Sequence, residues 1–200
     1  APDATEPETP EPVDRAPDTA EPVDTAPDTT EPDTTGEVTE VLPAADTSKL
    51  SAPPYLMWVT QTEVSVRWET KSAVVGRVDF GATDALGQTI EESAASTTHE
   101  LRLTNLTPNA VHSYRVVYGG GALPIRHFRT APADTDTTPF NFIVWGDNQD
   151  GPDTFSDLVP LMSDIDPRFA VSVGDCVQNG TRGEYRSQLF SPMAGFADEV

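Results

Sequence analysis

Two aspartates, Asp147 and Asp175, are the residues of this sequence best placed to do chemistry. Each follows a glycine at the end of a short apolar run, 140–146 in the first case and 169–174 in the second. Runs rich in β-branched residues predict strands that are buried on both faces of a parallel sheet. Because ligands bind outside the carboxyl ends of such strands, both carboxylates should face one crevice, and each glycine should let the backbone turn sharply. Paired carboxylates suit divalent metal ions.

The two Gly-Asp stretches resemble the first two motifs of the calcineurin-like metallophosphoesterases. The first motif reads Gly-Asp-x-His, or Gly-Asp-x-Gly in purple acid phosphatases, and the second reads Gly-Asp-x-x-x-x-Gly, which ends here at Gly180. The resemblance implies that Asp147 and Asp175 bind two divalent metal ions (iron, manganese or zinc), with Asp175 bridging them. Gln149 stands where the first motif has histidine and is a weaker candidate ligand through its amide oxygen. The alternative is that Gly-Asp merely ends a strand and binds no metal. Either copy of the motif alone would not decide between the two interpretations.

Two further positions depart from the purple acid phosphatase pattern. Gln178 stands where those enzymes carry a tyrosine ligand, so the resemblance implies a site without a purple ferric centre. Cys176 follows the bridging aspartate and is either a thiolate ligand or, as we expect, a small buried apolar residue.

The later motifs of the family are absent from this sequence. It contains no Gly-Asn-His, and no histidine follows His127. The resemblance therefore implies that the general acid and the remaining metal ligands lie downstream of Val200. We expect an N-terminal fragment of a longer enzyme, inactive by itself, whose α/β domain starts at 139–200 and is incomplete.

Composition excludes several other classes of protein. The formal net charge is −21 and the sequence pI is about 4.1, so a nucleic-acid partner is not expected. The single cysteine, Cys176, rules out an internal disulfide, and no apolar run approaches the length of a membrane span.

The first 51 residues form an acidic segment rich in proline, threonine and aspartate. A repeat of ten residues occupies 11–20 and 21–30 and decays afterwards. Proline interrupts helices and sheet ladders, carboxylates repel one another, and few apolar side chains are present to offset the entropy of ordering. The sequence predicts a disordered linker over 1–51 that could anchor the folded part to a surface.

Residues 52–132 alternate between apolar and polar side chains in short runs separated by Gly, Pro and Asn. This pattern predicts an antiparallel β-sandwich. The stretch 106–116 and the closing 128–132 resemble a fibronectin type III-like module, and more closely the N-terminal domain of purple acid phosphatases. The corner tyrosine of such modules falls at His112. We interpret His112, His99 and His127 as structural or surface residues rather than metal ligands.

After a polar linker at 134–139, the sequence predicts one helix between the two Gly-Asp strands and another after them. The first, 153–165, has an apolar face at helical spacing but contains Pro160, which would kink a helix interior. The second spans 184–190 and stops before Pro192. The expected fold is thus an all-β sandwich followed by the start of an α/β metallophosphoesterase domain.

The functional expectation is a secreted or envelope-attached hydrolase. In its complete form, it would hydrolyse a small-molecule or protein phosphate ester by a two-metal mechanism and resemble a purple acid phosphatase. The alternative is a surface-exposed binding or display protein with a degenerate, non-catalytic phosphoesterase-like domain. Gln149 favours that alternative and the paired aspartates oppose it.

Overall fold

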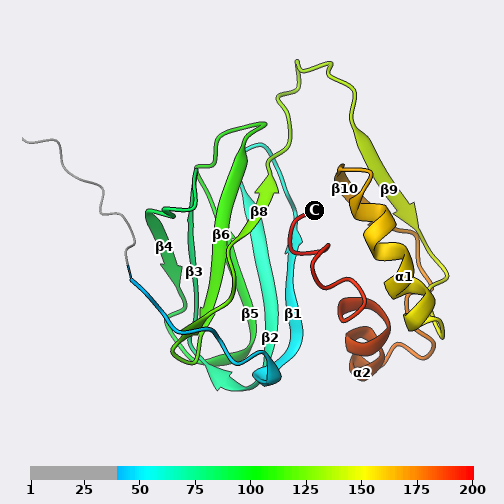
Figure 1. Cartoon of the computed structure of the whole chain (residues 1–200), viewed down its shortest axis with the longest axis horizontal. Helices are drawn as coiled ribbons and strands as arrows, with labels where there is room; N and C mark the ends of the chain where they lie inside the picture. The colour runs from blue at the N-terminus through cyan, green and yellow to red at the C-terminus, as the bar shows by residue number, and fades with distance from the viewer. Residues whose placement is uncertain (1–39) are drawn as a thin grey trace, which may run out of the picture. The chain divides into compact units, whose positions relative to one another are not determined.

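The computed structural model describes residues 40–200 (Figure 1). The chain divides into two units, Ala1–Asp33 and Thr34–Val200, and every described residue lies in the second. The disorder predicted for residues 1–39 lies outside the described residues. None of the described helices is long and apolar enough to cross a membrane.

A sandwich of two antiparallel sheets follows the short helix η1 (Thr47–Lys49), as the sequence predicts. One sheet has the order β1-β2-β5, and the other has the order β4-β3-β6-β7, with β8 also pairing with β6. The bounds are β1 Leu50–Met57, β2 Val64–Val74, β3 Gly76–Gly81, β4 Gln88–Glu91, β5 Ser96–Leu103, β6 Val111–Tyr118, β7 Gly121–Ala122 and β8 Arg126–Arg129.

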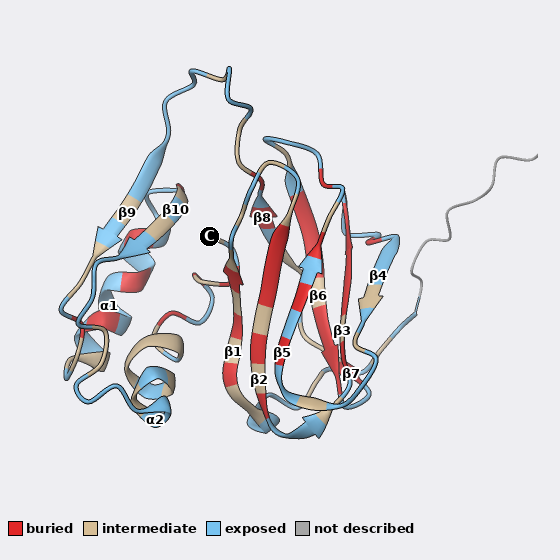
Figure 2. Ribbon diagram, turned by 180° about the vertical axis from the view of Figure 1, so that it is seen from behind, coloured by how far each residue is buried: buried red, intermediate tan, exposed pale blue. Residues whose placement is uncertain are grey.

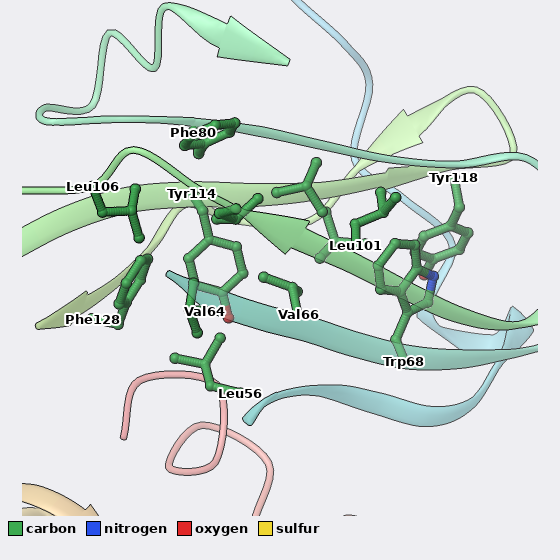
Figure 3. Close-up of a cluster of buried hydrophobic side chains, with 13 residues drawn as sticks. Leu56, Val64, Val66, Trp68, Phe80, Leu101, Leu106, Tyr114, Tyr118 and Phe128 are labelled. Atoms are coloured by element: carbon green, nitrogen blue, oxygen red, sulfur yellow. The ribbon is translucent and has the colours of Figure 1, made fainter. Parts of the chain in front are cut away.

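Alternating apolar residues of both sheets meet in one core, shown red in Figure 2 and as sticks in Figure 3. Val64, Val66 and Trp68 of β2 all point inward and are fully buried, which confirms the alternation read from this strand. Trp68 stacks on His99, with ring centroids 4.6 Å apart. Burial of this many large side chains is the main source of the sandwich's stability. The other members of the core are Leu56, Val78, Phe80, Leu101, Leu103, Leu106, Tyr114, Val116, Tyr118 and Phe128.

The three histidines all belong to the sandwich. His99 is buried, and its two ring nitrogens lie 2.9 Å from the Thr70 hydroxyl and 2.8 Å from the Glu92 carboxylate. His112 donates from Nε2 to the carbonyl of Thr107 at 3.1 Å. This bond to a backbone carbonyl a few residues upstream is the one a corner tyrosine makes, so His112 takes the tyrosine's place.

The folded region begins before the expected boundary at residue 51. Strand β1 starts at Leu50, so that boundary falls inside the strand. Ala45 donates its N–H to the carbonyl of Ala122 at 2.8 Å, and Tyr118 donates its hydroxyl to the Asp46 carbonyl at 3.2 Å. Pro53 and Pro54 lie within β1, which is an edge strand, where a missing N–H is tolerated.

After the sandwich, the chain forms two parallel strands joined by a helix, as predicted. Strand β9 (Asn141–Trp145) pairs with β10 (Pro167–Ser172), and α1 (Pro152–Ser163) connects them. Pro152 occupies the first turn of α1, and the helix continues through Pro160 to its last turn. The helix predicted over 184–190 is found as α2 (Arg182–Glu184) and the π-helical segment η2 (Tyr185–Phe190).

The described residues cover only one face of this two-stranded sheet. A small core of Phe155, Val159, Met162, Met193 and Phe196 packs against that face. The side chains that alternate with those facing this core, Phe142, Val144, Phe169 and Val171, are each exposed by two fifths or more, and β9 is drawn largely pale blue in Figure 2. Within residues 40–200 the strands are therefore buried on one face and not on both, because the described helices and C-terminal turns all lie on one side, as expected of an incomplete domain of two βα units.

Candidate metal centre

The two Gly-Asp loops lie side by side, because the pairing of β9 and β10 continues beyond the strands. Val173 donates its N–H to the Trp145 carbonyl at 2.8 Å. Asp147 then donates to the carbonyl of Gly174 at 3.3 Å, and Gln149 donates to the carbonyl of Asp175 at 3.1 Å. Three successive backbone hydrogen bonds thus fix the first loop against the second.

Both aspartates adopt the left-handed region of backbone conformation. Asp147 has φ 55° and Asp175 has φ 51°, and both side chains are exposed. Non-glycine residues are rarely found there, although aspartate tolerates the region better than most. Such conformations concentrate at functional sites.

The two glycines have different roles, which the sequence pattern does not distinguish. Gly174 itself adopts φ 118°, so it supplies the sharp turn expected of it. Gly146 is required for space: a Cβ there would lie 2.8 Å from a methyl carbon of Val173. In the first loop the left-handed residue is Asp147 itself.

Asn148 ties the two loops to the helical segment behind them. Its side chain is 7% exposed, and its Nδ2 donates to the carbonyls of Cys176 and Gln188, each at 3.1 Å. Its Oδ1 has no hydrogen-bond partner among the described residues. Sequence reasoning missed this residue. The sequence feature that could have pointed to Asn148 is its position between two candidate ligands, Asp147 and Gln149.

Gln149 is partly buried, and its Oε1 likewise lacks a hydrogen-bond partner among the described residues. A buried amide oxygen without a donor is costly unless something else satisfies it. A cation would do so, and amide oxygens are ligands of hard divalent ions. This orphaned oxygen agrees with the candidate role of Gln149.

A cluster of hydrogen bonds around Glu184 holds the loop that follows Asp175. The Glu184 carboxylate accepts from the N–H and side-chain amide of Asn179 at 3.1 and 2.7 Å, and from the N–H and hydroxyl of Thr181, both at 3.0 Å. Thr181 in turn accepts from the Glu184 N–H, which completes a capping box at α2. The hydrogen bond from Asn179, together with those from Thr181, lowers the pKa of Glu184. The carboxylate therefore stays ionised at neutral pH.

Other residues singled out in the sequence have smaller roles. Cys176 is half-buried, with its Sγ 2.8 Å from the Ser172 hydroxyl. Gln178 is exposed. A cavity of about 260 Å³ opens beside Asp147 between β9 and α1, lined in part by Trp145, Thr154 and Leu158.

The three candidate ligands are carried on two neighbouring, hydrogen-bonded loops. Within residues 40–200, no group of three or more His, Cys, Asp or Glu side chains is arranged to hold an ion. Two exposed carboxylates and one buried amide oxygen, all borne on hydrogen-bonded loops, are nevertheless the oxygen donors that a divalent cation takes.

Comparison with solved structures finds a likeness that extends over most of the chain. The structure of PhoD aligns with 78% of this chain at 13% identity and a TM-score of 0.60. Because the alignment covers 37% of PhoD, the chain spans about a third of that protein. This likeness concerns the fold.

Shorter alignments match the chain to fibronectin type III structures. A domain derived from the human KIAA0970 protein covers 46% of this chain and 80% of its own (14% identity, TM-score 0.36). The chicken CNTN1 FN1–FN3 domains cover 40% of this chain and 29% of their own (20% identity, TM-score 0.33). No family model matches the chain, and no curated protein matches it.

Proposed function

We propose that this chain is part of a metal-dependent phosphoesterase related to the purple acid phosphatases, which hydrolyses phosphate esters with two divalent ions. The observation that carries the proposal is the pairing of the two Gly-Asp loops at one end of a parallel strand pair. The shared fold with PhoD supports it over 78% of the chain.

In this proposal, Asp147 and Asp175 would hold the divalent ions, and Gln149 would add its amide oxygen. Iron, manganese or zinc, when bound, would neutralise the charge of a phosphate group and lower the pKa of a water molecule. The chain's own part is positional. The bonds from Asp147 and Gln149 to the second loop set the spacing of the carboxylates, and Asn148 fixes both loops to the helical segment.

The charge of the chain bears on partners and location. A formal net charge of −21 repels polyanions, so the proposed substrate is a small-molecule or protein phosphate ester rather than nucleic acid. An acidic, proline-rich N-terminal segment would suit a secreted or envelope-attached enzyme anchored outside the membrane. The general acid is proposed to lie outside residues 1–200.

Titration of the 200-residue chain with Mn²⁺, followed by electron paramagnetic resonance, tests the metal site. The wild type should bind Mn²⁺, and Asp175→Asn should lose that binding, because it removes a charge from between two cations. Asp157→Asn is the matched control, since it removes one exposed carboxylate from the middle of α1. Equal binding by the wild type and Asp175→Asn would contradict the assignment.

In this proposal, activity belongs to a longer protein that contains this chain. There, Asp175→Asn should reduce hydrolysis of a chromogenic phosphate ester by orders of magnitude, whereas Gln149→Ala should reduce it modestly and Gln149→His should tighten metal binding. A display or binding protein with a degenerate domain is the second candidate. It is favoured by Gln149, which stands where the related motif has histidine, and failure of a longer protein containing this chain to bind metal or turn over substrate would support it.

A further inference from the structure

Glu69, in the middle of the long sandwich strand β2, forms ion pairs with two arginines that follow the second Gly-Asp loop. Its Oε1 lies 2.6 Å from Nη2 of Arg182, and its Oε2 lies 2.7 Å from Nη2 and 3.0 Å from Nε of Arg186. The Glu69 side chain is 15% exposed, and Arg182 also donates to the Thr98 hydroxyl of β5 at 2.9 Å. Charge-assisted bonds that are partly shielded from water are stronger than surface ion pairs.

The first arginine, Arg182, lies directly after the loop that begins at Asp175. Arg182 is the first residue of α2, and its neighbour Thr181 is the N-cap. Thr181 and Asn179 are both bonded to Glu184, as described above. Glu69 thus restrains the end of a short, exposed loop whose start is Asp175.

The second arginine, Arg186, lies close to the segment that holds the Asp147 loop. Arg186 lies in η2, two residues before Gln188, whose carbonyl accepts from Asn148 between Asp147 and Gln149. The same segment is stacked on the sandwich at its far end, where the rings of Phe190 and Tyr55 are 4.6 Å apart. Both candidate ligand loops are therefore anchored to a segment that Glu69 holds.

We propose that Glu69 is a positioning residue for the metal centre: through Arg182 and Arg186, it fixes the loops that carry Asp175 and Asp147. The expected effect of Glu69 on metal affinity rests on the proposed function. Its structural part, the ordering of residues 175–181, can be measured without any metal. The sandwich then acts as a component of the site rather than as a spacer.

The test compares Glu69→Gln with Glu100→Gln in the 200-residue chain. Glu100 is the matched control, because it lies on the adjacent strand β5 and, among residues 40–200, its ion-pair partner is Arg67 of the sandwich. In Glu69→Gln, amide hydrogen exchange at 175–181 should rise about tenfold, as for loss of a charged hydrogen bond, while strands β2 and β5 stay protected. Mn²⁺ should bind about tenfold more weakly, with a changed resonance spectrum, at a temperature where every variant is folded.

Two further measurements make the outcome decisive. Glu69→Asp keeps the charge and should recover part of the Mn²⁺ affinity, which a purely structural contact would not require. The double variant Glu69→Gln/Arg182→Met should lose less Mn²⁺ binding free energy than the sum of the losses in the two single variants. Unchanged exchange at 175–181 together with unchanged Mn²⁺ affinity in Glu69→Gln would overturn the inference and leave the proposed function standing. If the wild type binds no Mn²⁺, the proposed function fails, and unchanged exchange would still refute the positioning role.

Discussion

The sandwich and the α/β segment of this chain stabilise themselves in different ways. The sandwich closes a core of fully buried side chains between two sheets. The α/β segment buries a smaller core on one face of a two-stranded sheet and exposes Phe142, Val144, Phe169 and Val171 on the other. A sheet that is covered on one face lacks about half of the burial that stabilises parallel strands.

Polar contacts with the sandwich compensate for part of that deficit. Tyr114, which is fully buried, donates its hydroxyl to the carbonyl of Asp198 at 2.6 Å, and Leu56 donates its N–H to the carbonyl of Ala197 at 2.7 Å. Arg126 pairs with Asp198 at 3.0 Å. The α/β segment should therefore be the less stable region and should depend on the sandwich, but not the reverse.

The largest effect is expected in the sandwich core. Trp68→Ala removes a fully buried ring and should lower the free energy of unfolding by about 3–5 kcal/mol, measured by denaturant titration. Trp58→Ala is the control, because Trp58 is 71% exposed and its loss should change stability by at most about 0.5 kcal/mol. In Trp68→Ala, the amides of both the sandwich and the α/β segment should lose protection from hydrogen exchange. Survival of an ordered α/β segment would refute its dependence on the sandwich.

A smaller effect is expected from the buried tyrosine that joins the regions. Burial raises the pKa of Tyr114 well above its usual value, so its hydroxyl remains a donor at all ordinary pH values. Tyr114→Phe leaves the Asp198 carbonyl unsatisfied and should cost about 1–3 kcal/mol, with faster exchange confined to 193–200. Tyr118→Phe removes a comparable bond to Asp46 and should leave 193–200 unchanged. Equal exchange in the two variants would show that the bond does not hold the C-terminal turns.

Acid should loosen the α/β segment through Glu69. Burial alone would raise the pKa of Glu69, but the hydrogen bonds and charges of Arg182 and Arg186 outweigh it and hold the pKa below its usual 4.5. A carboxyl with a lowered folded pKa stabilises fully above the unfolded value and loses that contribution as pH falls through the folded one. The protection of amides at 175–190, expressed relative to the intrinsic exchange rate at each pH, should therefore decrease below about pH 4.5, and less so in Glu69→Gln. Identical pH profiles would assign the acid response to other carboxylates.

The smallest effect on stability is expected on the exposed face of β9 and β10. Val144→Thr keeps the β-branched shape at a position that is 54% exposed, so the free energy of unfolding should change by at most about 0.5 kcal/mol. Self-association, followed by light scattering, should decrease because the apolar patch shrinks. A loss of several kcal/mol would show that this face is covered in solution.

The sequence predicted the elements of both regions but only part of their surroundings. Alternation in 63–69 and the apolar runs before Asp147 and Asp175 are local patterns, and the strands they predict are present. An incompletely covered sheet was expected of two βα units, but an apolar run does not reveal which of its faces finds a partner, so the identity of the exposed face was not predicted. Asn148 and Glu69 were missed for a related reason: their partners lie 28 to 117 positions away in the chain. The metal-binding roles of Asp147, Asp175 and Gln149 remain predictions.

The left-handed backbone of Asp147 and Asp175 has a consequence for laboratory evolution. Glycine adopts that region without steric cost, whereas a residue with a Cβ loses roughly 1 kcal/mol there. A library screened for thermal tolerance alone should therefore accumulate glycine at these two positions, each replacement gaining stability while discarding a carboxylate. A screen that also demands metal uptake should retain aspartate at both. The divergence between the two populations would record how much folding stability this loop pair forgoes to keep its charges.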